Sequence, residues 1–397
     1  MSGVPERRAF VLVIDACGVG ALPDAASYGD EGTNTLAHVA EAAGGLELPI
    51  LGALGLGSIL PVRGVPAAAH PSIHGRLHPL GPGKDSVSGH WELMGVVMER
   101  ALPVYPDGFP PEVIERLVHA TGREFICNRP YNGLAALEDF GSEHLRTGAL
   151  ILYTSQDSVL QLAAHVDRVS VDELYRACGA ARAAMTGEHA VGRVIARPFT
   201  GPPGAFTRVP GRRDFAVPPP GWSYLDELQE SGVDVNGVGK ISDLFNGRGV
   251  GSSHPGATNA QALASVEELL GTLGHGLVFA NLVETDQVHG HRKDVHGFAA
   301  ALREIDRALG RWLGHLRAGD LLIVTADHGV DPAHPGSDHT REYVPLLAVT
   351  RSMLLDARSG ARHDGPMADV GATVLRWLAA RDSEELPGDS FLEDVAA

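Results

Sequence analysis

Residues 10–15 read FVLVID, a run of apolar and largely β-branched side chains that ends in an aspartate. Two further runs have the same form, LVFANLVETD at 277–286 and LLIVTADHG at 321–329. Continuous apolar runs of this kind are typical of parallel strands that helices cover on both faces. Helix-like segments such as 296–317 lie between them. The sequence therefore predicts an α/β fold with a central, mostly parallel sheet sandwiched by helices.

Each of these runs delivers an aspartate where the predicted strand ends: Asp15, Asp286 and Asp327. In open α/β sheets, ligands bind outside the carboxyl ends of the strands, so we expect the three carboxylates at one edge of the sheet. A further predicted strand, VDVNGVGK at 233–240, brings Lys240 to the same edge.

The composition changes between about residues 100 and 215. Segments dense in proline and glycine, at 101–113 and 198–221, stand on either side of a block with apolar runs of its own. Such flanks are typical of the two crossings of an inserted domain. We predict a metal-binding catalytic core made of 1–99 and 216–397, and an inserted, smaller α/β cap for substrate binding at 100–215.

The bulk properties of the chain exclude several classes of protein. A length of 397 residues exceeds what one hydrophobic core usually serves, which favours two domains. The net charge is −17 and no Lys/Arg-rich stripe is present, which argues against a nucleic-acid partner. No window approaches about 20 uninterrupted apolar residues, so no membrane span is expected. Nothing in the sequence points to an oligomeric state.

The three cysteines point to a reducing compartment. They have no CxxC spacing and one is left over after any pairing, which argues against a disulfide framework or a cysteine-based zinc site. The N-terminal apolar run is cut short by Asp15, so no signal peptide is expected. We therefore expect the protein in the cytoplasm.

A metal site is predicted from aspartates and histidines that gather after these strands. Taken alone, Asp327 and His328 in TADHG also fit an aspartate that caps a helix beside a surface histidine. A cluster of three carboxylates and three imidazoles at one sheet edge, however, is best explained by cations. The predicted ligands are Asp15, Asp327 and His328 for one ion, and Asp286, His291 and His339 for the other. Oxygen and imidazole ligands without thiolates suit Mn²⁺ or Zn²⁺, and paired ions typically bracket a phosphoryl group.

A nucleophile is predicted in the polar segment GKDSVSGHWE at 83–92. A serine hydroxyl reacts poorly near neutral pH, but coordination to a divalent metal can help to deprotonate it. We assign this role to Ser86. Two alternatives stay open at this point, because Ser86 could instead cap a turn or helix and Ser88 has the same chemistry.

Motifs along essentially the whole chain resemble those of the phosphopentomutases, a family of the alkaline-phosphatase superfamily. The matching stretches are VIDACGVGALPDA, GDEGTNTLAH, GKDSVSGHWELMG, YTSQDSVLQLAAH, VGRVIARPF, FTRVPGRRDFA, VGKISDLF, TADHG and DPAHPGSDHTREYVPLL. The resemblance implies an alkaline-phosphatase-like core with an inserted cap. It also implies two Mn²⁺ ions, with Zn²⁺ or another divalent metal as the alternative.

The resemblance also implies a reaction and its substrates. The enzyme would be an isomerase that interconverts α-D-ribose 1-phosphate, or its 2-deoxy form, with the 5-phosphate in nucleoside salvage or catabolism. A sugar bisphosphate would act as intermediate and primer. The phosphorylated residue of the family falls on Ser86, where members of the family carry threonine and this chain keeps the hydroxyl on serine.

By the same resemblance, a set of polar residues would contact the pentose phosphate. These are Ser155, Asp157, Arg193 and Arg208 from the cap, and Lys240 from the core. Arginine and lysine are natural partners of a phosphate dianion, and an aspartate suits sugar hydroxyls. His289 and His334 lie near two of the predicted ligands and are interpreted as loop residues.

Three other functions share part of this pattern. A phosphatase and a metal-dependent phosphoglycerate mutase would use the same two-metal core, but YTSQDSVLQ and RVIARPF favour a pentose substrate. A binding protein without catalysis would not need six intact ligand candidates together with Ser86. A turnover assay combined with metal analysis distinguishes these functions.

Overall fold

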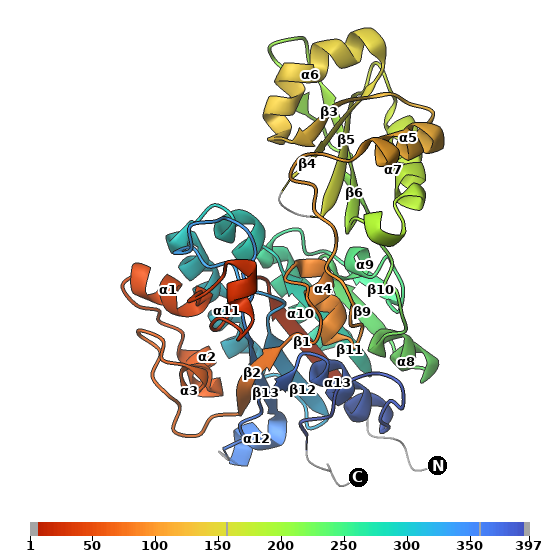
Figure 1. The fold of residues 1–397 in the computed structure, drawn as a ribbon. Coiled ribbons are helices and arrows are strands. Elements are labelled where there is room, and N and C mark those ends of the chain that lie inside the picture. The colour runs from red at the N-terminus through yellow and green to blue at the C-terminus, as the bar shows by residue number, and fades with distance from the viewer. Residues whose placement is uncertain (1–6, 156–157, 357–358, 393–397) are drawn as a thin grey trace. The chain divides into compact units, whose positions relative to one another are not determined.

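The computed structural model describes residues 7–155, 158–356 and 359–392, and the chain divides into two compact units (Figure 1). The first unit consists of Met1–Ala101 and Pro219–Ala397, and the second is Leu102–Pro218. The second unit is thus a single insertion in the sequence of the first. The catalytic and substrate-binding roles of the two units stay predictions.

The first unit is built on an eight-stranded sheet. In sheet order the strands are β10 (Ser252–His254), β9 (Val235–Val238), β11 (Gly276–Leu282), β1 (Arg8–Ile14), β12 (Asp320–Thr325), β13 (Val344–Thr350), β2 (Ile73–His78) and β14 (Gly365–Pro366). β13 runs antiparallel to both of its neighbours, and the other pairs are parallel. The predicted α/β fold with a mostly parallel central sheet is confirmed.

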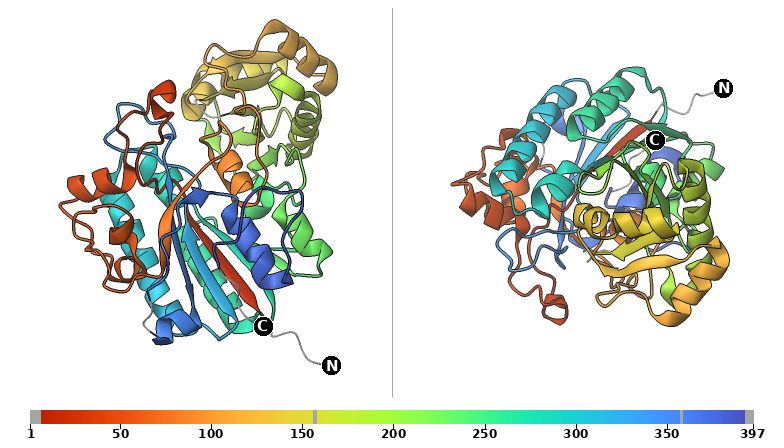
Figure 2. Two further views of the ribbon diagram at one scale, coloured as in Figure 1. Left: turned by 60° about the horizontal axis from the view of Figure 1, so that its bottom comes forward. Right: turned by 90° about the horizontal axis from the view of Figure 1, so that it is seen from above.

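Helices pack on both faces of this sheet (Figure 2). One layer contains α10, α11, α1 and α2, which contact one another, and the other contains α13, α8 and α4. The helices are α1 (Thr35–Ala42), α2 (Pro49–Leu54), α3 (Leu56–Ile59), α4 (Ser86–Leu93), α8 (Tyr224–Glu230), α9 (Ile241–Leu244), α10 (Asn259–Thr272), α11 (Val295–Leu313), α12 (Arg351–Asp356) and α13 (Asp369–Ala379), with short η1 (Ala25–Tyr28) and η3 (Thr285–Gly290). Along α11, Phe298, Leu302, Ile305 and Leu309 are buried, the spacing of an amphipathic helix.

The sheet topology brings several loops to one edge. β1, β9, β11, β12 and β2 point the same way, so the segments that follow them begin at a common edge. β13 runs the opposite way, so the segment that precedes it lies at that edge too. In open α/β sheets, ligands bind at the edge where such segments meet.

A buried ion pair joins the starts of β1 and β12. Arg8 Nε and Nη2 donate to the two carboxylate oxygens of Asp320 at 2.7 and 2.6 Å, and Nη1 donates to the carbonyl of Leu270 at 2.7 Å. Both side chains are almost fully buried. The pair joins the two strands at the end of the sheet opposite to the loops described above.

Arg8→Met is expected to lower the free energy of unfolding by about 3–5 kcal/mol, because it leaves the Asp320 carboxylate buried without its partner. Chemical denaturation followed by circular dichroism measures the loss. The control is Arg63→Met, which breaks an exposed pair with Glu41 and should change stability by less than about 1 kcal/mol. Equal losses in the two variants would contradict the assigned difference.

The second unit has a mixed sheet of its own. The strand order is β3 (Phe125–Pro130), β4 (Leu150–Thr154), β5 (Val159–His165), β6 (Arg193–Thr200) and β7 (Thr207–Arg208), and β8 (Arg213–Ala216) also pairs with β6. Its helices are α5 (Pro111–Thr121), α6 (Gly133–Thr147) and α7 (Val171–Ala184), with short η2 (Gly187–His189). One apolar cluster joins the sheet to α5 and α7, and a second joins it to α6. Alternate residues of β4 belong to the two clusters, as the period of a strand requires.

The described residues include no helix that is both long and apolar enough to cross a membrane.

Candidate active site

The six predicted metal ligands all lie at the loop-bearing edge of the first sheet. The set comprises Asp15 after β1, Asp286 and His291 in and after η3, Asp327 and His328 after β12, and His339 before β13. All except His291 are buried. The strand order explains the convergence, since β11, β1, β12 and β13 are consecutive in the sheet.

Asp15, Asp327 and His328 form one group with the spacing of metal ligands. His328 Nε2 lies 3.5 Å from Asp15 Oδ1 and 3.3 Å from Asp327 Oδ2. The other oxygen of Asp327 accepts hydrogen bonds from the backbone N–H groups of Ala16 and His328, at 3.0 and 3.1 Å. One oxygen of Asp327 is thus held by the backbone while the other faces the group.

The second group with this spacing consists of Asp286, His339 and, again, His328. Asp286 Oδ1 lies 3.5 Å from His339 Nε2 and 3.3 Å from His291 Nε2. The rings of His328 and His339 are 4.0 Å apart between centroids. His328 therefore belongs to both groups, whereas the prediction from the sequence assigned each of the six residues to one metal only.

The surroundings shift the pKa values of the carboxyl groups in this cluster in different directions. Burial, followed by the charges of Asp327 and Asp286, raises the pKa of Asp15 well above its ordinary value. Burial alone would raise the pKa of Asp286, but the close contact with His339 and its charge, together with the charges of His291 and His328, lower it. Burial would likewise raise the pKa of Asp327, but His328 and His90 lower it. Burial lowers the pKa of His328.

These residues fit divalent cations. Asp286 Oδ1 and Asp327 Oδ2 are buried, and neither accepts a hydrogen bond of good geometry from any residue that the structure describes. A buried carboxylate oxygen without a donor is costly unless a cation takes the donor's place. The ligand atoms are carboxylate oxygens and imidazole nitrogens, a set typical of Mn²⁺ and Zn²⁺.

Ser86 is the first residue of α4, and its hydroxyl faces the first group. Ser86 Oγ lies 3.0 Å from His328 Nε2 and 3.5 Å from Asp15 Oδ1. The helix is capped by Asp85, whose side chain accepts from the N–H groups of Val87 and Ser88. Ser86 is therefore not the capping residue.

The alternative, Ser88, is engaged elsewhere. Its hydroxyl donates to Asp85 Oδ2 at 2.8 Å, with the Asp85 carbonyl oxygen 3.0 Å away, and its Oγ accepts from the Asp85 N–H at 3.3 Å to complete a capping box. This geometry favours Ser86 over Ser88 as the residue presented to the acidic cluster.

Lys240 also reaches the cluster. It follows β9 at the N-cap of α9, and its Nζ lies 3.8 Å from Asp15 Oδ2. Its positive charge partly offsets the carboxylates. It is the predicted substrate-binding residue that the structure places in the first unit.

The other predicted substrate-binding residues belong to the second unit. Arg193 begins β6, and its Nη1 lies 3.5 Å from Asp214 Oδ2. Arg208 is exposed in β7, opposite Phe199 at the far end of β6. Ser155 directly follows β4. Asp157 lies outside the described residues.

Comparison with known proteins places the chain in a family. Residues 7–382 match the model of the metalloenzyme superfamily. The chain is 45% identical to the phosphopentomutase of Dictyoglomus turgidum over 390 residues, which are 98% of each chain. It is 47% identical to that of Carboxydothermus hydrogenoformans over 93% of this chain and 95% of the relative. The chain belongs to the phosphopentomutase family.

As a phosphopentomutase, the chain is a metal-binding, phosphate-transferring mutase, which is a kind of isomerase. Another relative is the phosphopentomutase of Anaeromyxobacter dehalogenans strain 2CP-1, with 46% identity over 98% of this chain and 99% of the relative. A phosphoglycerate mutase structure from Leishmania mexicana covers 98% of each chain with a TM-score of 0.49 and 14% sequence identity.

Sequence reasoning missed two arginines in the second unit of this phosphopentomutase. Burial and the charge of Arg212 lower the pKa of Arg197 to about 10, and Arg208 adds to this effect. Arg197 Nε is buried, and none of the described residues accepts a hydrogen bond from it. Arg212 pairs with Asp214 through two contacts of 2.8 Å. The motif RVIARPF contains Arg197, but its sequence alone does not show that it lies among other arginines.

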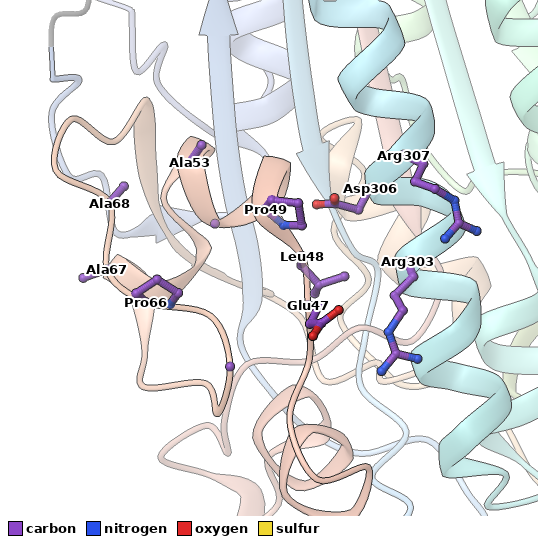
Figure 3. A pocket seen from close by; sticks show the side chains of 12 residues that line it. Glu47, Leu48, Pro49, Ala53, Pro66, Ala67, Ala68, Arg303, Asp306 and Arg307 are labelled. Carbon is purple, nitrogen blue, oxygen red and sulfur yellow. The ribbon is translucent and has the colours of Figure 1, made fainter.

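A cavity of about 710 Å³ in the first unit does not coincide with this site (Figure 3). It lies between the α2 region and α11, and no predicted site residue lines it. Its carboxylate at Asp306 is already used, since Oδ1 accepts from the N–H groups of Ile50 and Leu51 at the start of α2. The predicted site residues thus lie at the sheet edge and not in this cavity.

Proposed function

We propose that this phosphopentomutase interconverts α-D-ribose 1-phosphate, or its 2-deoxy form, with the corresponding 5-phosphate through a phosphoserine at Ser86. The supporting observation is that the Ser86 hydroxyl faces a buried cluster of carboxylates and imidazoles, 3.0 Å from His328 Nε2. The names of the relatives support a pentose phosphate as the substrate. We assign the reaction to nucleoside salvage in the cytoplasm.

The proposed cycle conserves the phosphoryl group. The 5-hydroxyl of ribose 1-phosphate attacks phospho-Ser86, the bond from phosphorus to Oγ breaks, and the hydroxyl proton passes to the serine. Oγ of Ser86 then attacks the 1-phosphate of the resulting bisphosphate, the bond from phosphorus to the sugar oxygen breaks, and the serine proton passes to that oxygen. Ribose 5-phosphate leaves and phospho-Ser86 is restored, so a small amount of bisphosphate is enough to prime the enzyme.

The two groups of ligands would hold two divalent metals, for which the family resemblance favours Mn²⁺. Asp15, Asp327 and His328 are assigned to one metal, and Asp286, His291 and His339 to the other. Bound divalent cations would stabilise negative charge on the transferring phosphoryl group and lower the pKa of the Ser86 hydroxyl. The chain itself orients Ser86 through the Asp85 cap and supplies Lys240 as a further positive charge.

We assign substrate binding to the second unit. Arg193, Arg197 and Arg208 lie in its strands, Arg212 directly precedes β8, and Asp214 pairs with Arg193 and Arg212. Guanidinium groups bind phosphate with two parallel hydrogen bonds, and a surplus of positive charge favours a dianion. Water must be kept from a phosphoenzyme if phosphate is to return to the sugar, and we assign this role to the same unit as a cap.

The proposed substrate is tested by comparing ribose 1-phosphate, 2-phosphoglycerate and a simple aryl phosphate as substrates of the Mn²⁺-loaded protein. We expect turnover of the pentose phosphate to exceed that of the other two by at least about 10³-fold, since discrimination rests on groups built to bind one substrate. Comparable turnover of phosphoglycerate, or release of phosphate as the main product, would refute the assignment.

Arg193→Ala and Arg208→Ala are expected to weaken substrate binding and to raise the ratio of free phosphate to ribose 5-phosphate. Losing one charged contact to phosphate should raise KM by roughly 10–100-fold. Ribose 5-phosphate and free phosphate are followed in parallel from ribose 1-phosphate. Both variants should keep the metals bound.

The control is Arg146→Ala, which removes an exposed arginine of α6 that lies 3.9 Å from Glu143. It should leave KM and the product ratio unchanged. If Arg193→Ala and Arg208→Ala behave like this control, the second unit does not bind the substrate phosphate.

A further inference from the structure

His90 lies between the proposed nucleophile and the carboxylates of the first group. It is fully buried on α4, four residues after Ser86. Its Nδ1 is 2.8 Å from the carbonyl oxygen of Ser86 and 3.2 Å from Asp327 Oδ2. Its Nε2 is 3.2 Å from the side-chain nitrogen of Asn281. The ring therefore connects the first turn of its own helix to two other segments of the chain.

Asn281 continues this chain of contacts to Asp15. It is a fully buried residue in β11, and its Nδ2 donates to Asp15 Oδ2 at 3.0 Å. A carboxylate oxygen accepts hydrogen bonds, so the amide must present its NH₂ group on this side. The same NH₂ group is the one that faces His90 Nε2. Asp15 thus fixes the orientation of the Asn281 amide.

The contacts allow one arrangement of hydrogens on His90. Because Asn281 donates to Nε2, this nitrogen must accept, and the ring hydrogen must lie on Nδ1. Nδ1–H then donates to the Ser86 carbonyl, with Asp327 Oδ2 beside it. An imidazole with its hydrogen on Nδ1 and none on Nε2 fits the contacts with Ser86 and Asn281.

Packing leaves the ring little freedom. The His90 ring lies 5.9 Å from the ring of Phe279, centroid to centroid. The preceding residue, Gly89, lies so close to Asp327 that a Cβ on it would collide with the Asp327 carbonyl oxygen. The start of α4 thus packs directly against the turn that carries Asp327.

We propose that His90 and Asn281 are positioning residues that hold Ser86 in register with Asp15 and Asp327. The proposal rests on Ser86 being the nucleophile. A misplacement of a reacting atom by about 1 Å can slow a reaction by about 100-fold, which is the effect that such a link prevents. The link joins α4, β11 and the ends of β1 and β12 through four side chains and one carbonyl.

Variants of His90 test which nitrogen matters. An asparagine side chain can place an N–H near the position of Nδ1, whereas a glutamine reaches the position of Nε2. We expect His90→Gln, which loses the contact with the Ser86 carbonyl, to lower kcat by about 10–100-fold with little change in KM, and His90→Asn, which loses only the contact with Asn281, to lower kcat less. His74→Gln is the control, since His74 is another buried histidine whose Nδ1 contacts a backbone carbonyl, that of Ser72, at 2.9 Å. It should leave kcat unchanged.

Asn281→Asp provides a second, nearly isosteric test, because it replaces the NH₂ group with an acceptor at both contacts. If His90 and Asn281 act as one link, the loss of kcat in the double variant His90→Gln/Asn281→Asp should equal the larger single loss and not the product of the two. The rate of Ser86 phosphorylation by a sugar bisphosphate, read by mass spectrometry, should fall in parallel with kcat.

The outcomes separate this proposal from the proposed function. Wild-type kcat in both folded single variants, or multiplied losses in the double variant, would overturn the link even if Ser86→Ala is inactive. Should His90→Gln fail to fold, Asn281→Asp alone decides the matter through kcat and the phosphorylation rate. Activity retained in Ser86→Ala would instead remove the proposed function itself.

Discussion

Ser86→Ala is expected to lower mutase turnover by at least about 10³-fold while the protein folds and binds its metals. The substitution removes only the Oγ atom, which lies 3.0 Å from His328 Nε2 and 3.5 Å from Asp15 Oδ1. The helix cap is unaffected, because Asp85 provides it. The loss should therefore fall on phosphoryl transfer and not on stability. Ser86→Thr, which keeps the hydroxyl, should retain activity.

Mass spectrometry of peptides from protein primed with sugar bisphosphate locates the phosphate directly. It should be on Ser86 in the wild type and absent from Ser86→Ala. Ser88→Ala is the matched control, because this neighbour loses capping contacts to Asp85 but should keep turnover and phosphorylation. Phosphate found only on Ser88 would move the nucleophile by two residues.

Asp327→Asn is expected to lower kcat by at least about 10²-fold and to weaken one metal site. Oδ1 of the new amide can still accept from the N–H groups of Ala16 and His328, so the turn should keep its shape. The other oxygen is replaced by an NH₂ group, which can neither bind a cation nor supply negative charge beside His328. Metal content after dialysis, measured by plasma mass spectrometry, should fall from two ions per chain toward one.

The matched control is Asp331→Asn, four residues further along the chain. Asp331 is equally buried, but it accepts from Ala333 and Asn34 and contacts His38, outside both groups of ligands. Its variant should keep both metals and most of the turnover. Full activity of Asp327→Asn in a protein shown to be free of metal would contradict the two-metal proposal.

The fold, and the convergence of the predicted site residues at one edge of the sheet, could be predicted from local sequence patterns. The runs that end at Asp15, Asp286 and Asp327 are β1, β11 and β12 with the turns that follow, and the parallel register takes all three to one edge. Because strand direction fixes where a strand's end lies, an apolar run followed by an aspartate carries both fold and site information. Ser86 was predicted from its polar segment and from the family resemblance, and the structure adds that β2, which precedes it, points to the same edge.

Other features depend on side-chain geometry that no sequence pattern encodes. In the structure, His328 belongs to both groups of candidate ligands, because its ring lies against that of His339. The spacing of residues in the sequence does not show where the rings lie. Asn281 was read as part of an apolar strand. The one indication in the sequence is that an amide side chain stands within an otherwise apolar segment, where burying a polar group without a hydrogen-bond partner would destabilise the fold.

The arginines of the second unit illustrate the same limit. Arg193 and Arg208 were predicted from the family resemblance. Arg197 and Arg212 were not, because only the structure shows that they lie close enough for the charge of Arg212 to lower the pKa of Arg197. That proximity results from β6 and β8 pairing across a long connection.

The most direct test of the proposed activity is the conversion of ribose 1-phosphate by purified protein. The protein is stripped of metal, supplied with Mn²⁺ and a trace of sugar bisphosphate, and ribose 5-phosphate is measured over time against the metal-free sample. We predict that ribose 5-phosphate accumulates with little free phosphate, and that it forms only when the metal is present. Equal conversion without any divalent metal, or free phosphate and ribose as the main products, would contradict a metal-dependent phosphoserine mutase.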